Sequence, residues 1–439
     1  MKFVTGASRK PTGWQDLAGG GRNNRPAAVH GAVHSLRNMG GLAFLTLRLA
    51  RGTVPCVCAP DILPAGLCEE CCVELSGTVR AEARAPGGLE IAAESIKVLS
   101  RPAAPLPLSL SKRRLGLNLD TGLALRPAVL RHGRERAVFR IQEGLVRAFR
   151  DYLTGEGFTE IHTPKIVCAG AEGGSSIFRL DYFGKKAYLA QSPQFYKQTM
   201  AGVFERVFEI GPVFRAEKHA TPRHLNEYTG LDLELGYIRS FYDVIELEAG
   251  YLRHAMALLA QEYAPELARL GVELPTVDRI PCLRFDDAKR LAAERYGGRS
   301  RDPYDLEPEE EARIGRYAKE ELGSDLVFVT HYPSKKRPFY AMDDPDDPRY
   351  TLSFDLLFRG MEVTTGGQRV HGHAEQLAKL EARGMDPADF ESYLMIHKYG
   401  MPPHGGLGIG LERLTMQLCG LDNIRHASLF PRDRTRLDP

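Results

Sequence analysis

Residues 207–235, VFEIGPVFRAEKHATPRHLNEYTGLDLEL, contain two alternating segments on either side of a polar, basic loop. Alternation with a period of two is typical of β-strands, so the stretch predicts an antiparallel pair. The polar residues fall in the loop or on one face of the pair: Arg215, Glu217, Lys218, Arg223, His224, Tyr228, Asp232 and Glu234. Such a face could hold a nucleoside triphosphate, with arginine at phosphate and the ring at the base, or be a solvated face of ion pairs.

Residues 352–371, LSFDLLFRGMEVTTGGQRVH, predict a hairpin whose two-residue turn is Arg359–Gly360. In that register Leu357 faces Glu362, and Asp355 lies diagonally from Glu362 on the same face of the sheet. Two carboxylates in this arrangement suit Mg²⁺, which typically takes one or two carboxylates plus substrate phosphates. The prediction depends on the register, because a slip of one residue reverses the faces.

A short helix start is predicted in QSPQFYKQ, residues 191–198. Ser192 is the expected N-cap and Pro193 the first helical residue, which puts Lys197 in the opening turns. Helix N-termini favour anions, so a lysine there indicates an anion site.

The segment PPHGGLGIGLERLTMQL, residues 402–418, predicts a glycine-rich strand followed by a helix. Glycines permit a close approach of the backbone, and Arg413 near the helix start favours phosphate. The segment is not a P-loop, because it lacks the GxxxxGK[ST] pattern.

The composition of the whole chain is that of an ordinary soluble protein: 439 residues, 43% hydrophobic and 26% charged, with a net charge of +2. This length suits two or three domains. No apolar stretch reaches membrane-spanning length, and the N-terminus lacks the apolar core of a signal peptide. A cytoplasmic protein is therefore expected, and a nucleic-acid partner must be inferred from local features.

Four segments are expected, in an α+β fold. Residues 26–100 hold five short alternating runs separated by turn residues, which predicts a closed barrel of the OB-fold kind. Residues 1–25 read as a flexible, glycine-rich lead-in, and residues 101–133, proline-rich and then basic, as a linker or hinge. Residues 134–439 mix helices with strands that look antiparallel.

Two features of the predicted barrel bear on ligands. Phe44 and Arg48 share the face away from the core, which suits stacking on single-stranded bases or is a simple packing edge. Five cysteines lie close together in the sequence: Cys56, Cys58, Cys68, Cys71 and Cys72. They could hold zinc, but a single CxxC is a weak signal, and reduced thiols are the simpler interpretation.

The three nucleotide-site segments, in this order, resemble the active site of the class II aminoacyl-tRNA synthetases. GFTEIHTPKI resembles motif 1, with Pro164 at the dimer interface; FRAE through YTGLDLE resembles motif 2; and GIGLER resembles motif 3. QSPQFYKQ, RHLNEYTGLDLE, MEVTTGGQR, YGMPPHGGLGIGLER and NIRHASLFPRD are similar to the archaeal-type aspartyl-tRNA synthetases. The resemblance implies a homodimer with an OB-fold anticodon-binding domain and a catalytic antiparallel sheet flanked by helices.

The resemblance also implies how L-aspartate is bound. Lys197 and Arg369 would meet its side-chain carboxylate, and Glu172 would lie in a loop that closes over it. The α-ammonium group would be held by Ser192, Gln194 and Asp232. A guanidinium plus a point charge selects a short carboxylate well, because asparagine would leave both cations unpaired.

For ATP, the resemblance implies that Arg215 holds the α-phosphate and Tyr228 stacks on adenine. The remaining nucleotide contacts would come from Glu217, Arg223, His224, Glu362 and Arg413, with Arg413, Arg223 and His224 at the distal phosphates. Asp355 and Glu362 would bind Mg²⁺. Aspartate would attack the α-phosphorus in line, and the 3′-terminal ribose hydroxyl of the tRNA would then attack aspartyl-adenylate.

Three barrel residues bear on which tRNA is charged: His34, Phe44 and Pro86. Discriminating relatives carry Trp where this chain has His34, and a lysine-bearing loop where it has Pro86. They also carry Glu near Ser76 and Gln near Cys56, so individual anticodon contacts differ here. The resemblance thus predicts an enzyme that charges both tRNA-Asp and tRNA-Asn, with a tRNA-dependent amidotransferase as partner.

Other interpretations remain open on the sequence alone. The enzyme could be a strictly discriminating aspartyl-tRNA synthetase or, against the presence of Lys197, an asparaginyl-tRNA synthetase. An amide ligase that makes asparagine from aspartyl-adenylate would lack the barrel. A non-catalytic single-strand binding protein would not need Arg215, Asp355, Glu362 and Arg413.

Overall fold

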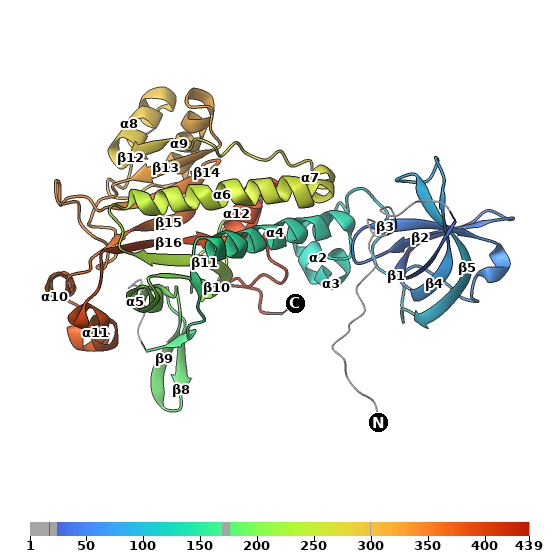
Figure 1. The fold of residues 1–439 in the computed structure, drawn as a ribbon, viewed down its shortest axis with the longest axis horizontal. Coiled ribbons are helices and arrows are strands. Elements are labelled where there is room, and N and C mark those ends of the chain that lie inside the picture. The colour runs from blue at the N-terminus through green and yellow to red at the C-terminus, as the bar shows by residue number, and fades with distance from the viewer. Residues whose placement is uncertain (1–16, 18–23, 169–175, 299, 439) are drawn as a thin grey trace. The chain divides into compact units, whose positions relative to one another are not determined.

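The computed structural model describes residues 17, 24–168, 176–298 and 300–438. The chain divides into two compact units, Met1–Glu135 and Arg136–Pro439 (Figure 1).

The first unit is a closed barrel in the strand order β1-β2-β3-β5-β4, as the sequence predicted. The strands are β1 (Arg25–Asn38), β2 (Ala43–Arg48), β3 (Thr53–Cys58), β4 (Cys72–Ala81) and β5 (Leu89–Ser100), with a 3₁₀ turn at Pro60–Ile62. Alternate apolar residues such as Val29, Leu45 and Leu75 fill its interior. Two short helices, α2 (Leu119–Ala124) and α3 (Arg126–Val129), lie in the segment expected to be a linker. The predicted domain boundaries stay predictions.

Strict alternation fails in β1 at His34. Val33 pairs with Leu47 and Ser35 with Thr46, so His34 is an extra residue in a β-bulge. The regular alternation of β1 therefore ends at Val33. The bulge lets Leu36 pack against the core beside Val33. Without the bulge, regular alternation would have turned Leu36 outward.

Arg48 is not available for single-stranded bases. Its guanidinium donates two hydrogen bonds to Glu70, at 2.6 and 2.7 Å, and Arg131 donates a third at 2.7 Å. Phe44 is 44% exposed, so only the aromatic part of the predicted pair is accessible.

The cysteine cluster does not have the geometry of a zinc site. Cys56 and Cys58 are buried in β3, and burial raises the pKa of the Cys56 thiol. The Sγ atoms of Cys68 and Cys71 lie 3.5 Å apart in the following loop. Among the residues that the structure describes, no group of three or more His, Cys, Asp or Glu side chains could hold a metal ion.

The second unit is built on an eight-stranded sheet in the order β12-β13-β14-β15-β16-β11-β10-β6. The strands are β6 (Thr159–Glu160), β10 (Arg206–Phe214), β11 (Glu227–Gly236), β12 (Cys282–Arg284), β13 (Leu326–Thr330), β14 (Ser353–Phe358), β15 (Met361–Arg369) and β16 (His404–Gly410). The five pairs from β13 to β10 are antiparallel, as predicted, whereas β6 and β12 add parallel edges.

Two long helices, α4 (Gly133–Gly155) and α6 (Tyr242–Glu262), lie side by side against one face of the sheet (Figure 1). Val138, Ile141 and Leu145 of α4 are buried, and their spacing puts them on one face of the helix. The helices approach closely at Gly144, where a Cβ atom would lie 2.6 Å from Leu259 Cδ2.

Smaller elements complete the unit: a sheet of β7 (Ile166–Val167), β8 (Arg179–Tyr182) and β9 (Lys185–Leu189), the helices α5 (Gln194–Phe204), α7 (Ala264–Leu270), α8 (Phe285–Tyr296), α9 (Pro308–Glu321), α10 (His373–Ala382), α11 (Glu391–Tyr399) and α12 (Leu411–Cys419), and 3₁₀ turns at Pro387–Phe390 and Ile424–Ala427. Within the described ranges, none of the helices has the length and apolar character needed to span a bilayer.

Candidate active site

Strands β11, β15 and β16 form the floor of a pocket of about 380 Å³. Leu231 and Leu233 of β11 face the core, whereas Gly230 and Asp232 at the alternate positions line the pocket. Most of the predicted site residues meet in its lining: Ser192, Gln194, Lys197, Arg215, Glu217, Arg223, His224, Tyr228, Asp232, Glu362, Arg369 and Arg413. Asp355 is not in the lining, and Glu172 lies outside the described residues.

Several lining residues were not predicted from the sequence. Arg337 and Tyr340 belong to the basic and aromatic run KKRPFY, residues 335–340, which was a usable signal. Thr365 sits in the predicted hairpin but was assigned no role. These residues add a guanidinium, a phenol and a hydroxyl group to the lining.

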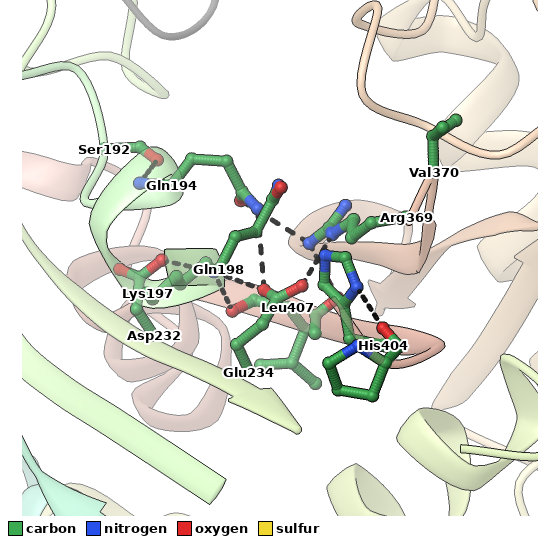
Figure 2. A network of polar contacts seen from close by, with 12 residues as sticks. Ser192, Gln194, Lys197, Gln198, Asp232, Glu234, Arg369, Val370, His404 and Leu407 are labelled. Atoms are coloured by element: carbon green, nitrogen blue, oxygen red, sulfur yellow. Dashed lines mark hydrogen bonds and ion pairs between the residues drawn. The ribbon is translucent and has the colours of Figure 1, made fainter. Parts of the chain in front are cut away.

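Lys197 is 1% exposed and holds two acceptors. Its Nζ donates to Asp232 Oδ1 at 2.8 Å and to the Leu407 carbonyl at 2.7 Å, with Glu234 at 3.8 Å (Figure 2). Burial raises the pKa of the Asp232 carboxyl, and Lys197 opposes that rise. Helix α5 begins at Gln194 rather than Pro193, and the Ser192 hydroxyl accepts from the Gln194 N–H at 3.0 Å.

Arg369 enters the same pocket from the end of β15. Its Nε donates to Glu234 Oε1 at 3.0 Å, and Nη2 donates to the Gly406 carbonyl at 2.9 Å (Figure 2). The pocket therefore buries two cations, Lys197 and Arg369, with two carboxylates, Asp232 and Glu234. Buried charges are tolerated when they are paired in this way, and the pairing fixes both cationic groups.

Neutral histidines back Arg369. Burial lowers the pKa of His404 to about 3, and that of His397 to about 4. His404 Nδ1 lies 2.9 Å from the Pro402 carbonyl (Figure 2). Because these rings stay uncharged at neutral pH, they do not repel the guanidinium beside them.

The other end of the pocket carries the remaining arginines. Arg215 follows β10, and its backbone N–H donates to the Asn226 carbonyl at 2.9 Å. Arg413 Nη1 donates to the Glu362 carbonyl at 3.1 Å and to its Oε1 at 3.3 Å. Arg223 donates to Glu311. Burial, and next Arg413, lower the pKa of His224, whose Nδ1 lies 2.6 Å from the Thr221 hydroxyl.

The β14–β15 hairpin has the predicted turn and one unpredicted bulge. Leu357 pairs with Glu362, and Arg359 and Gly360 take φ values of +47° and +77°, as the two-residue turn requires. A register shift beyond Leu357 then places Asp355 opposite Thr365. The diagonal relation of Asp355 to Glu362 is therefore wrong by one residue.

The donor set still fits a divalent cation. Burial, and also the charge of Glu362, raise the pKa of Asp355 to about 6, although Arg337 opposes the rise with an ion pair at 2.8 Å. Asp355 Oδ1 is buried and makes no hydrogen bond of ordinary geometry to the described residues. Thr365 Oγ1 lies 3.2 Å from Glu362 Oε1. A hard cation would satisfy these oxygens, with Glu362 as the accessible carboxylate.

The three anticodon candidates lie on different elements of the barrel. His34 is in the bulge of β1, Phe44 in β2, and Pro86 in the exposed turn between β4 and β5.

Two family models match the chain. Residues 118–434 match the model described as tRNA synthetases class II (D, K and N), and residues 27–99 match that of the OB-fold nucleic acid binding domain.

Relatives and solved structures cover nearly the whole chain. The chain is 48% identical to the "Aspartate--tRNA(Asp/Asn) ligase" of Thermus thermophilus, over 93% of this chain and 96% of the relative. The "Aspartate--tRNA(Asp) ligase" of Pyrococcus horikoshii is 38% identical, over 95% and 97%. Asparaginyl-tRNA synthetase from Pyrococcus horikoshii, solved with asparaginyl-adenylate, has a TM-score of 0.89 at 30% identity, over 98% of this chain and 100% of that one.

Proposed function

The chain belongs to the class II tRNA synthetases of the D, K and N group, a family of enzymes, and we propose that it is an aspartate–tRNA ligase. It activates L-aspartate with ATP to aspartyl-adenylate and transfers the aspartyl group to the 3′ end of tRNA. The observation that carries this proposal is the pair of buried cations, Lys197 and Arg369, in one pocket. A carboxylate side chain would give these cations a charge-assisted hydrogen bond in addition to those they make to Asp232 and Glu234, whereas an amide oxygen would accept a weaker, neutral one.

The residues of the pocket divide the work by charge. Ser192, Gln194 and Asp232 hold the α-ammonium group, which leaves the α-carboxylate facing the nucleotide. Arg215 neutralises charge that develops at the α-phosphorus during in-line attack, and Tyr228 stacks on adenine.

The distal phosphates lie against Arg223, His224 and Arg413. Glu362 and Asp355, with the Thr365 hydroxyl, would hold Mg²⁺, which supplies positive charge to the phosphates when bound. Catalysis then rests on positioning and electrostatics rather than on proton transfer.

Aspartate-dependent exchange of pyrophosphate into ATP tests the amino-acid specificity. Aspartate and asparagine are assayed side by side with the purified protein and Mg²⁺. Exchange with aspartate alone is expected. A preference for asparagine would favour an asparaginyl-tRNA synthetase, which the structural similarity to that enzyme makes the second candidate.

We propose further that the enzyme charges tRNA-Asn as well as tRNA-Asp. The relatives at 48% and 46% identity carry Asp/Asn in their names, whereas the one at 38% is named for tRNA(Asp). His34 supports the proposal, because an imidazole is smaller than an indole and presents a donor or an acceptor to the third anticodon base. Pro86 has no N–H to donate.

Charging both tRNA transcripts with radiolabelled aspartate tests this breadth. Comparable charging of the two is expected, and His34→Trp should shift the ratio toward tRNA-Asp. One base contact is worth ~1–3 kcal/mol, so a preference for tRNA-Asp of about a thousandfold in the unmodified enzyme would overturn the proposal. A ratio unmoved by His34→Trp would direct attention to Pro86.

The oligomeric state, the cellular location and a partner enzyme complete the proposal. The enzyme acts as a homodimer with Pro164 at the interface, as the resemblance to motif 1 implies. It works in the cytoplasm with a tRNA-dependent amidotransferase, because aspartate on tRNA-Asn must be converted to asparagine before it is used.

A further inference from the structure

Glu311 lies on α9, outside the three sequence motifs. Its carboxylate nevertheless contacts one loop and one strand that line the pocket. The side chain is 8% exposed. Its Oε2 accepts a hydrogen bond from Arg223 Nη2 and another, at 3.2 Å, from the backbone N–H of Glu362. One buried oxygen therefore ties the loop between β10 and β11 to strand β15.

Helix α9 presents Glu311 at a fixed position, because its backbone packs directly on the β14–β15 turn. A Cβ atom on Gly315 would lie 2.3 Å from the Gly360 nitrogen, and one on Gly360 would lie 2.8 Å from the Ala312 Cα. One turn further along, Ile314 and Ala318 are buried in a cluster with Leu357 of β14. The helix cannot slide against the turn without a steric clash, so the Glu311 carboxylate is held in register with Glu362.

Arg223 is only partly used by this contact. A guanidinium has five N–H donors in a rigid plane, and Glu311 binds the Nη2 group. The Nε atom of Arg223 is buried without a hydrogen-bond partner in the described structure, and the residue lines the pocket. A phosphate oxygen would satisfy such a donor with a short, charge-assisted bond.

The second distal arginine is supported in the same manner. Arg413 donates to the backbone carbonyl and the carboxylate of Glu362. Each of the two arginines thus donates to an acidic residue, Arg223 to Glu311 and Arg413 to Glu362. The two acids are linked, because the Glu362 backbone N–H donates to Glu311.

We infer that Glu311 is a positioning residue for ATP: it holds Arg223 in the orientation in which its remaining donors meet the distal phosphates. The inference rests on the proposed function, since it takes ATP as the ligand of this pocket. It assigns a role to a residue of α9 that is not among those that line the pocket.

The neighbouring Glu310 offers a matched control. It is also buried, at 5% exposure, and lies on the same helix. Its contacts are Lys289, at 3.2 Å, and the backbone N–H of Glu307 at the helix start, rather than any residue of the pocket. Substitution of Glu310 therefore measures the cost of removing a buried acid from α9 without disturbing Arg223.

The experiment compares Glu311→Gln with Glu310→Gln in aspartate-dependent ATP–pyrophosphate exchange. Glu311→Gln should lower kcat/KM for ATP ~10- to 100-fold, because an amide replaces the carboxylate that accepts from Arg223, while KM for aspartate stays within ~2-fold. Glu310→Gln should leave both constants within ~2-fold. Glu311→Asp keeps the charge on a shorter side chain and should recover part of the loss.

Combining Glu311→Gln with Arg223→Ala separates positioning from a general structural effect. In the Arg223→Ala background, adding Glu311→Gln should lower kcat/KM for ATP by less than ~3-fold, because the effects of residues that act as a unit are not additive. Losses that multiply, or a Glu311→Gln enzyme with normal kcat/KM for ATP, would refute the inference. If Glu311→Gln does not fold, Glu311→Asp carries the same comparison.

Failure of the proposed function and failure of the role of Glu311 give different experimental results. An unmodified protein that shows no aspartate-dependent exchange would contradict the proposed function. In that case ATP binding by calorimetry still tests Glu311, because weaker ATP binding is expected in Glu311→Gln and unchanged binding in Glu310→Gln.

Discussion

Replacing Lys197 by methionine tests the selection of the substrate carboxylate most directly. Lys197 is almost fully buried, and two of its three N–H donors are already used by Asp232 and the Leu407 carbonyl. The third is the one that can meet a substrate. Methionine keeps much of the volume and removes the charge.

Two losses add in this variant. A hydrogen bond to a charged group is worth ~1.5–3 kcal/mol, and each ~1.4 kcal/mol is a factor of about ten. In addition, Lys197 holds down the pKa of the buried Asp232, so its removal favours a protonated Asp232 that no longer pairs with the α-ammonium group. We expect kcat/KM for aspartate to fall at least ~30-fold, with KM for ATP nearly unchanged.

The assay is pyrophosphate exchange with aspartate and with asparagine. Because asparagine has no side-chain carboxylate for Lys197 to meet, the ratio of the exchange rate with aspartate to that with asparagine should fall along with the rate for aspartate. Near-normal activation of aspartate by Lys197→Met would refute the assignment of the pocket.

Stability must be measured in the same samples, because breaking a buried ion pair costs ~3–5 kcal/mol. Lys165→Met is a control for the loss of an ion pair outside the pocket lining: Lys165 pairs with Glu209 of the neighbouring strand β10 at 2.8 Å, and its charge also lowers the pKa of Asp232, though less than that of Lys197 does. Comparable melting temperatures with a selective loss of aspartate activation in Lys197→Met would separate recognition from folding.

Two further outcomes follow from buried carboxylates. Glu362→Gln should abolish adenylate formation while leaving the protein folded, and calcium should replace Mg²⁺ poorly; ordinary exchange activity in this variant would contradict the metal assignment. Burial raises the pKa of Glu248 from 4.5 to about 8, so the folded state keeps a proton that the unfolded state has lost between these pH values, and the free energy of unfolding falls ~1.4 kcal/mol per pH unit as the pH rises through this window. The melting temperature of Glu248→Gln should therefore be well above that of the unmodified protein at pH 8.5 and close to it at pH 5. The same difference in melting temperature at both pH values would contradict the raised pKa of Glu248.

Most of the pocket could be predicted from the sequence because short-range rules fix it. A two-residue turn at Arg359–Gly360 determines the pairing of Leu357 with Glu362, and period-two alternation separates Asp232 from the leucines of β11. These rules extend only as far as the strand is regular. The bulge beyond Leu357 has no marker in the sequence, and it moved Asp355 opposite Thr365.

Contacts over long sequence separations were beyond such rules. Arg48 lies on the outer face of β2 by alternation, but Glu70, brought alongside by the loop before β4, takes its guanidinium. In the same way, the acidic run PEEEAR, residues 308–313, reads as an ordinary helix start with a solvated face. That Glu310 and Glu311 are buried, and that Glu311 reaches Arg223, depends on the packing of α9 against the sheet.

The bulge at His34 shows why this distinction matters for tRNA choice. His34 is itself the extra residue in β1, and the bulge that it forms lets Leu36 pack against the core. A tryptophan introduced here reports on the side chain alone only while the bulge persists, since a one-residue slip would expose Leu36 and turn Ser35 inward. The His34→Trp enzyme should therefore keep the melting temperature and aspartate exchange of the unmodified protein while its tRNA ratio changes. A changed ratio with a destabilised barrel would instead mean that the strand had shifted register.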